Sequence, residues 1–462
     1  MAESRLRNFF RRFVGENARS AGRSLAGLLL LAALVQAGLA RLEGTATRPL
    51  TGDEKRYVAV ATSWAAGEPA ELDPLWPPGY PATLAVLLRC GGSLASVVGL
   101  QILALLAAGL ALAGIARAAG ATPVFAWLAG AVLVVDPEVA AFARFFWPET
   151  LHLALLLAAL LLAIRCLSSD GKARQPLRLA MLGVVAGAAI ALKSLLLPLL
   201  PLLALPVLRA ATRRQRVAHG LLVALPLVAV LVPVVSFQMT HNGVRGLGGS
   251  ARFNLWVGLT DSASRSLEGD RTWSEYLTYR AGGADFAERQ RALTRRIREY
   301  VDARGVPAVL AGQFPRQYFR LFDRESYFGA MLPPGGRLVL AGEGYRAAPP
   351  LLARLFGYGE LALYCVILFA APFGLVRLLR ERRPGARWIG GLLVYQLVLF
   401  YFLHVQSRYR LTLLPVLILG AVWAVQTLWR RGRAGELPVS GLDLAAGGCG
   451  AALLLYFAFG AT

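Results

Sequence analysis

Long runs of apolar residues dominate the chain, and its charged residues gather in short clusters between these runs. A run of about 20 apolar residues has the length of a helix that crosses the hydrocarbon core of a bilayer. Neither heptad arrays nor internal repeats are visible along the sequence. The pattern therefore predicts an all-α, polytopic membrane protein.

Eleven transmembrane helices are expected from this pattern. The first covers about residues 24–41, and the second ends near residue 117. The others cover about 123–136, 150–165, two segments within 178–209, and then 217–238, 353–377, 388–404, 408–429 and 439–460. Arginines precede the first span and basic clusters follow alternate spans, which predicts a cytoplasmic N-terminus. The polar segments 42–80 and 239–350 are then external. We predict one membrane domain over residues 1–462, with no separate C-terminal soluble domain.

The run 178–209 decides the topology of everything that follows it. As one helix it would be about 48 Å long, which is too long for one ordinary span and short for two. A single span would place Arg213, Arg214 and Arg216 outside the cell. Two short spans, broken near Lys193 and the prolines after it, keep these arginines inside, so we predict two.

The long external segment contains one strongly amphipathic stretch. Phe286, Leu293, Ile297 and Tyr300 recur at helical spacing among charged residues, which predicts an amphipathic helix. Such a helix can lie on the membrane, cap a site or pack on its own domain. The sequence leaves these three alternatives open.

The charge and cysteine content of the chain argue against several classes of function. The formal charge of +22 at pH 7 comes from residues that flank apolar spans, which is typical of topology signals and headgroup contacts and not of a nucleic-acid-binding surface. The four cysteines (Cys90, Cys166, Cys365, Cys449) show neither zinc-site spacing nor a disulfide pattern. We therefore expect membrane lipids as partners and no nucleic acid. The Arg-, Ala- and Leu-rich composition favours a bacterial inner membrane.

Several ionisable residues map to the external ends of the predicted spans. They are Asp53, Glu54, Glu149, Lys193, Arg408 and Arg410. Charges at membrane depth are costly and mark functional sites by default. Structural roles remain open for two of them, because Lys193 can extend to the headgroups and Glu149 follows Pro148 at a helix start, where the helix dipole favours an acid. We interpret Asp53 as the reactive group.

Motifs for other chemistries are absent from the sequence. It has no Walker-type phosphate loop, no dinucleotide-binding glycine pattern, no Gly-x-Ser-x-Gly and no His-Glu-x-x-His. It has no Asp-x-Asp pair, and its four histidines do not cluster along the chain. We therefore assign no metal ligands and no cofactor, although a divalent metal bound without a recognisable motif stays open.

Five pieces of sequence, in order along the chain, resemble the GT-C membrane glycosyltransferases. They are Asp53-Glu54-x-x-Tyr57 with Trp76-Pro77-Pro78-Gly79-Tyr80-Pro81, then Arg144-Phe145-Phe146-Trp147-Pro148-Glu149, Asn254-Leu255-Trp256-Val257-Gly258, Phe314-Pro315-Arg316, and Ser407-Arg408-Tyr409-Arg410-Leu411-Thr412-Leu413-Leu414-Pro415. The resemblance runs from the first span to about residue 430. It is to the branch that contains glycosyltransferase family 39, the protein O-mannosyltransferase-like enzymes and the aminoarabinose-transferase-like enzymes.

The resemblance implies a GT-C-like fold and a sugar donor carried on a polyprenyl phosphate. It implies inverting transfer to a lipid, glycan or protein acceptor on the external face, with Asp53 as the general base. We infer that Lys193, Arg408 and Arg410 stabilise the departing phosphate, and that Glu54 assists Asp53 by orienting it or its loop. The residues expected to shape the loop or the acceptor site are Tyr57, Pro77, Pro78, Tyr80, Arg144 and Glu149.

Two departures limit what the resemblance implies. Close aminoarabinose-type enzymes carry a lysine before the Pro-Pro pair, where this chain has Trp76. They also have a C-terminal periplasmic domain, for which we expect no counterpart. Assignment as a lipid A-modifying enzyme is therefore not supported.

Two other functions remain as alternatives. A lipid-linked glycan flippase or transporter would be expected to carry its charges near the bilayer midplane on broken, repeated helices. A membrane polysaccharide polymerase or ligase would centre its chemistry on the long external segment, for instance at Arg252, Arg271 or Arg280.

Overall fold

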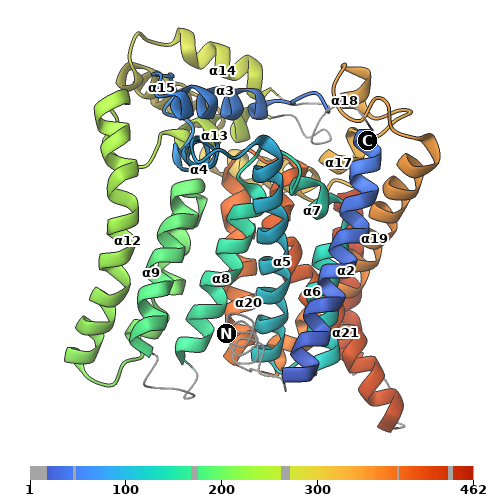
Figure 1. Cartoon of the computed structure of the whole chain (residues 1–462). Helices are drawn as coiled ribbons and strands as arrows, with labels where there is room; N and C mark the ends of the chain where they lie inside the picture. The colour runs from blue at the N-terminus through green and yellow to red at the C-terminus, as the bar shows by residue number, and fades with distance from the viewer. Residues whose placement is uncertain are drawn as a thin grey trace.

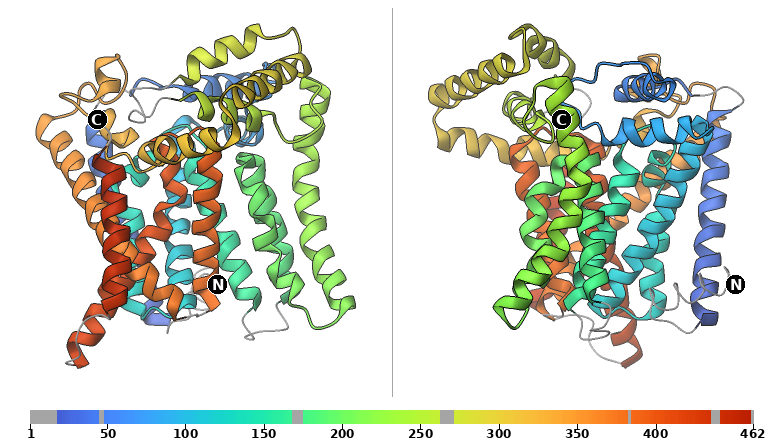
Figure 2. Two further views of the ribbon diagram at one scale, coloured as in Figure 1. Left: turned by 180° about the vertical axis from the view of Figure 1, so that it is seen from behind. Right: turned by 60° about the vertical axis from the view of Figure 1, so that its left-hand side comes forward.

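Helices form all the regular structure in the part of the chain described here. The computed structural model describes residues 18–44, 48–167, 175–261, 271–381, 384–434 and 441–460. Long helices stand side by side, and shorter helices lie across one end of the bundle (Figures 1 and 2). The all-α fold predicted from the sequence is confirmed.

Eight helices in these ranges are long and apolar enough to cross a membrane. They are α2 (Ala18–Glu43), α5 (Leu94–Ala119), α8 (Glu149–Leu167), α9 (Gln175–Leu192), α12 (Arg213–Asn242), α19 (Pro350–Arg380), α20 (Pro384–Phe402) and α22 (Gly441–Phe459). The other predicted spans correspond to shorter or more charged segments, namely α6 (Pro123–Val135), the stretch Ser194–Leu208 and α21 (Leu414–Ala434). The chain is a multi-pass membrane protein, and the count of eleven spans stays a prediction.

The run 178–209 is interrupted where the sequence predicts a break. Helix α9 ends at Leu192, and Lys193 has an extended backbone. Three short elements follow, the 3₁₀ helix η2 (Ser194–Leu199), α10 (Leu200–Leu203) and α11 (Leu205–Leu208). Pro198 lies inside η2 and has no backbone N–H to donate, so a regular α-helix does not continue through it.

Short helices gather at one end of the bundle, which we call the capped end (Figure 1). They are α3 (Asp53–Ala66), α4 (Gly79–Arg89), α7 (Pro137–Phe142), α13 (Ser250–Thr260), α14 (Thr272–Ala281), α15 (Phe286–Arg304), α16 (Val306–Leu321), α17 (Tyr327–Ala330) and α18 (Arg337–Leu340). The 3₁₀ helix η3 (Ser407–Thr412) joins this end to α21. Both polar segments that were predicted to share one side of the membrane therefore lie at the same end.

The amphipathic helix predicted in the long polar segment is α15, and it packs on its own segment. Leu293 is buried in a small apolar cluster with residues of α13 and α14, and Ile297 and Tyr300 pack against that cluster. The ring of Phe286 lies so close to Gly249 that a Cβ there would meet it at 2.1 Å. Of the three arrangements left open, the structure shows packing within the domain.

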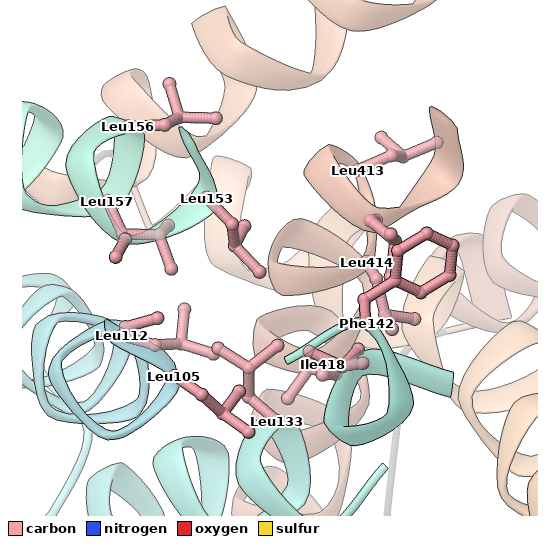
Figure 3. Packing of buried hydrophobic residues seen from close by; sticks show 14 of the residues in the cluster. Leu105, Leu112, Leu133, Phe142, Leu153, Leu156, Leu157, Leu413, Leu414 and Ile418 are labelled. Carbon is pink, nitrogen blue, oxygen red and sulfur yellow. The ribbon is translucent and has the colours of Figure 1, made fainter. Parts of the chain in front are cut away.

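A buried leucine-rich core fixes the helices that carry the polar residues of the capped end. Figure 3 shows Leu105 and Leu112 of α5, Leu133 of α6 and Leu153 of α8 packed together, with Ile418 of α21 beside them. Leu413 and Leu414, which directly follow η3, belong to the same core. Burial of these side chains stabilises the positions of the start of α8 and of η3.

Helices α19 and α21 contact each other through their backbones. A Cβ added at Gly374 of α19 would lie 1.7 Å from the carbonyl oxygen of Gly420 in α21. A Cβ at Gly420 would in turn lie 2.6 Å from the carbonyl oxygen of Ala371. Small residues allow membrane helices to approach this closely.

We predict that Gly374→Ala destabilises the protein by about 1–3 kcal/mol, because its methyl group must push α19 and α21 apart. The matched control is Gly359→Ala on the same helix, where a Cβ would meet nothing within 4 Å. Thermal unfolding of the purified protein in detergent measures both. An unfolding temperature for Gly374→Ala equal to that of the wild type would contradict this packing.

Candidate functional site

A cavity of about 140 Å³ lies at the capped end. Its walls come from the first polar segment, the long polar segment and the ends of α8, α9 and α20. Six of the residues predicted for the site line it: Asp53, Tyr57, Pro77, Glu149, Lys193 and Arg408. Residues far apart in the sequence are thus brought together at one place.

Asp53 is the first residue of α3 and faces Arg408 of η3. The preceding Gly52 has a φ of 49°, which favours glycine, and the chain turns there into the helix. The Asp53 Oδ2 atom lies 3.5 Å from a guanidinium nitrogen of Arg408, and the two side chains are 31% and 13% exposed. The guanidinium carbon of Arg408 lies 4.7 Å from the centre of the Trp147 ring. Asp53 therefore has access to the cavity beside a largely buried cation.

A second ion pair lines the same cavity. Lys193, at the break after α9, places its Nζ atom 2.9 Å from Oε1 of Glu149, the first residue of α8. The ammonium group also lies 5.2 Å from the centre of the Tyr409 ring, a distance typical of a cation–π contact. The guanidinium carbon of Arg408 lies 5.4 Å from the centre of the same ring, so both cations contact Tyr409.

Aromatic rings form another part of the cavity wall. Tyr57 packs edge-on against Tyr80 with their ring centres 5.3 Å apart. Burial, together with the charges of Asp53 and Glu149, raises the pKa of the Tyr57 phenol well above its ordinary value. Tyr57 therefore stays neutral, and its hydroxyl keeps a proton to donate.

Glu54 is fully buried and does not line the cavity. Its carboxylate accepts two hydrogen bonds from Arg48 at 2.6 and 2.7 Å and two from Thr51 at 2.8 and 3.0 Å. It also accepts a hydrogen bond of 2.8 Å from the backbone N–H of Phe146. These contacts fasten the start of α3 to the connection between α7 and α8. They leave Glu54 no contact with the cavity, and its role in orienting Asp53 or the loop stays a prediction.

Arg410 does not line the cavity, although Arg408 does. It is buried between Glu138 and Glu360, with nitrogen to oxygen distances of 2.8 and 3.1 Å. Both arginines belong to η3, and a 3₁₀ helix has about three residues per turn, so side chains two positions apart point in different directions. The role predicted for Arg410 at the donor phosphate therefore lacks a matching geometry.

The remaining predicted residues shape the surroundings of the cavity. The Nε atom of Arg144 donates to Glu43 of α2 at 2.9 Å. The hydroxyl of the buried Tyr80 donates to Gln101 of α5 at 2.9 Å. Pro78 precedes the first residue of α4 and faces another groove, whereas Pro77 lines the cavity.

Several lining residues were not predicted for the site. Trp147, Asn254 and Tyr409 lie inside motifs identified in the sequence, so those motifs carried a usable signal. His404 and Thr272 also line the cavity, and neither lies in a motif. The part of the chain that the structure describes contains no group of three or more His, Cys, Asp and Glu side chains placed to hold a metal ion.

Comparison with known proteins gives similarity at the level of the fold. No family model and no curated protein sequence matches the chain. It is similar to the crystal structure of the oligosaccharyltransferase of Archaeoglobus fulgidus in the apo form, with a TM-score of 0.50 and 13% identity over 95% of this chain and 55% of that one. The archaeal oligosaccharyltransferase AglB of the same organism, in complex with an inhibitory peptide and a dolichol-phosphate, aligns with a TM-score of 0.48 and 12% identity over 94% and 54% of the two chains.

The chain spans about half the length of these structures. The similarity to the apo structure shows that the chain has a GT-C-like fold, as the sequence resemblance implied.

We predict that Glu54→Gln destabilises the protein by about 3 kcal/mol or more, because it leaves the buried Arg48 without its carboxylate partner. Glu68→Gln, at an exposed position just beyond α3, is the matched control and should unfold like the wild type. Both are compared by thermal unfolding in detergent. Wild-type stability of Glu54→Gln would show that Glu54 does not fasten α3.

Proposed function

We propose that this chain is an inverting glycosyltransferase of a bacterial cell envelope. It transfers a sugar from a polyprenyl phosphate to a lipid, glycan or protein acceptor on the external face of the membrane. The observation that carries the proposal is the cavity in which Asp53 faces Arg408 beside the Lys193–Glu149 pair. The GT-C-like fold of the chain supports it.

In this proposal Asp53 is the general base. Its side chain is more exposed than that of Glu149, which is only 6% exposed and already bonded to Lys193. The acceptor group attacks the anomeric carbon on the face opposite the phosphate, and its proton passes to the Asp53 carboxylate. The bond between the anomeric carbon and the phosphate oxygen breaks with its electron pair on the phosphate, which inverts the anomeric configuration.

Arg408 and Lys193 stabilise the leaving phosphate in this mechanism. Charge that develops on an oxygen is stabilised most by fixed donors in a site shielded from water. The Arg408 side chain is 13% exposed and lies over the ring of Trp147, and the Lys193 side chain is 17% exposed. Two largely buried cations, each in contact with at least one aromatic ring, meet that requirement.

The distribution of arginines supports an external position for the capped end. Arginines occupy the last turn of α5, α8, α19 and α21 and the first turn of α12. All these turns lie at the end of the bundle opposite the capped end (Figure 1). Because positive residues near helix ends favour the cytoplasm, we assign that end to the cytoplasmic face.

The contacts of the long polar segment favour this proposal over chemistry centred on its arginines. Arg280 pairs with Asp73 at 3.0 Å, and Arg271 lies 3.6 Å from Glu275. Neither these two nor Arg252 lines the cavity. Asp53, by contrast, both lines the cavity and lies beside a cation.

We predict that Asp53→Asn lowers the turnover number for sugar transfer at least about 100-fold, because the amide cannot take a proton. The assay follows transfer from radiolabelled undecaprenyl-phosphate glucose, mannose and arabinose to an envelope extract by the purified protein in liposomes. Asp302→Asn, at an exposed position on α15, is the control and should transfer like the wild type.

Full transfer by Asp53→Asn would remove Asp53 as the base. Movement of the labelled lipid across the bilayer without transfer, by the wild type, would favour the flippase instead. Loss of transfer in both variants would indicate a defect unrelated to the cavity.

A further inference from the structure

A second cavity lies at the capped end, against the start of α19, and we call it the α19 hollow (Figure 1). Its volume is about 360 Å³, and its walls come from residues within the segments 324–334 and 353–361. None of its lining residues lines the cavity that contains Asp53. Sites for small molecules have volumes of about 300–1,000 Å³. The α19 hollow is therefore large enough for a ligand of its own.

Two acidic side chains line the α19 hollow, and both are paired with cations outside it. Glu360 places Oε1 3.1 Å from a guanidinium nitrogen of Arg410. Glu325 places Oε2 3.2 Å from Nε of Arg337. Neither Arg410 nor Arg337 lines the hollow. The negative charge of the two carboxylates is thus compensated from elsewhere in the fold.

Two arginines also line the α19 hollow, and neither has an acidic partner among the residues that the structure describes. Arg324 is half-buried, and its backbone N–H donates to the carbonyl oxygen of Ala458 at 3.2 Å. Its guanidinium carbon lies 5.5 Å from the centre of the Phe459 ring. Arg354 is exposed in the second turn of α19. Two positive charges therefore share one hollow, and an anionic ligand would compensate them.

The α19 hollow opens on the part of α19 that faces lipid. Leu351, Leu355 and Tyr358 are exposed at helical spacing, and Val366 and Phe369 continue this apolar face along the helix. Exposed apolar residues of a membrane-spanning helix contact acyl chains, and tyrosines are common at the level of the headgroups. Tyr358 is 71% exposed and also lines the hollow. A lipid whose chains lie along α19 can therefore place its headgroup in the hollow.

We propose that the α19 hollow binds the headgroup of an anionic phospholipid, with its phosphate held by Arg324 and Arg354. Guanidinium groups form charge-assisted hydrogen bonds with phosphate oxygens, often two at a time. Basic pockets between membrane helices bind anionic headgroups by the same chemistry. A phosphatidylcholine headgroup would instead bring a third positive charge to the two arginines. The hollow thus favours a lipid with a net negative headgroup.

This inference goes beyond the proposed function, because the lipid is not a substrate and its binding requires no sugar transfer. The first test measures binding of phosphatidylglycerol to the full chain in detergent by native mass spectrometry. Arg354→Gln and Arg324→Gln should each raise the Kd about tenfold, because each removes charge-assisted hydrogen bonds to the phosphate. Arg346→Gln is the matched control, since Arg346 is exposed between α18 and α19 and does not line the hollow.

Wild-type affinity of Arg354→Gln would overturn the proposal, and so would an equal loss of affinity in Arg346→Gln. Arg354 is exposed, so its substitution tests the proposal even if Arg324→Gln fails to fold. A ligand that binds the folded protein raises its unfolding temperature. Phosphatidylglycerol should therefore stabilise the wild type and Arg346→Gln against heat more than it stabilises Arg354→Gln, and equal stabilisation of all three would contradict the site.

The second test identifies the chemistry of the ligand. Phosphatidylcholine with the same acyl chains should bind the wild type at least about tenfold more weakly than phosphatidylglycerol, because its headgroup carries no net negative charge. Equal affinities would overturn selection of an anionic headgroup. Inorganic phosphate at the concentration of the lipid should leave lipid binding unchanged. Displacement of phosphatidylglycerol by inorganic phosphate would show that the hollow binds a free anion, and would overturn the lipid as its ligand.

Discussion

The architecture of the capped end depends on the pairing of charges that have been taken out of water. Removing a charge from water costs several kcal/mol unless an opposite charge and hydrogen bonds compensate for it. The pairs Asp53–Arg408 and Glu149–Lys193 meet this condition with residues of α3, η3, α8 and the break after α9. Four segments of the chain must therefore meet at one place, and the cavity lies where they meet.

Interruptions of helices create the room for these charges. Lys193 follows the end of α9, His404 follows the end of α20, and Arg408 lies in a 3₁₀ turn before α21. Irregular backbone at membrane depth is tolerated where it lines a cavity or is buried in protein. The helices below these breaks pack through leucines and glycines, so the apolar core holds the positions of the polar groups above it.

The sequence predicted the charged residues of the cavity better than their individual roles. Asp53, Lys193 and Arg408 were identifiable because an ionisable group beside an apolar run requires a partner. Arg410 carries the same signal, but its direction depends on the 3₁₀ geometry of η3, which no hydrophobic pattern specifies. The pairing of His404 with Asp261 was not predictable, because these residues are 143 positions apart and meet only through the close approach of α13 to α20.

The most direct test of the central claim is a cryo-electron microscopy structure of the full chain in nanodiscs with undecaprenyl phosphate. The claim is that Asp53, Arg408 and Lys193 form one reaction centre at the capped end. It predicts density for the phosphate in contact with Arg408 and Lys193, with the Asp53 carboxylate facing the same cavity. A phosphate bound at the opposite end of the bundle, or at the capped end away from both cations, would contradict it.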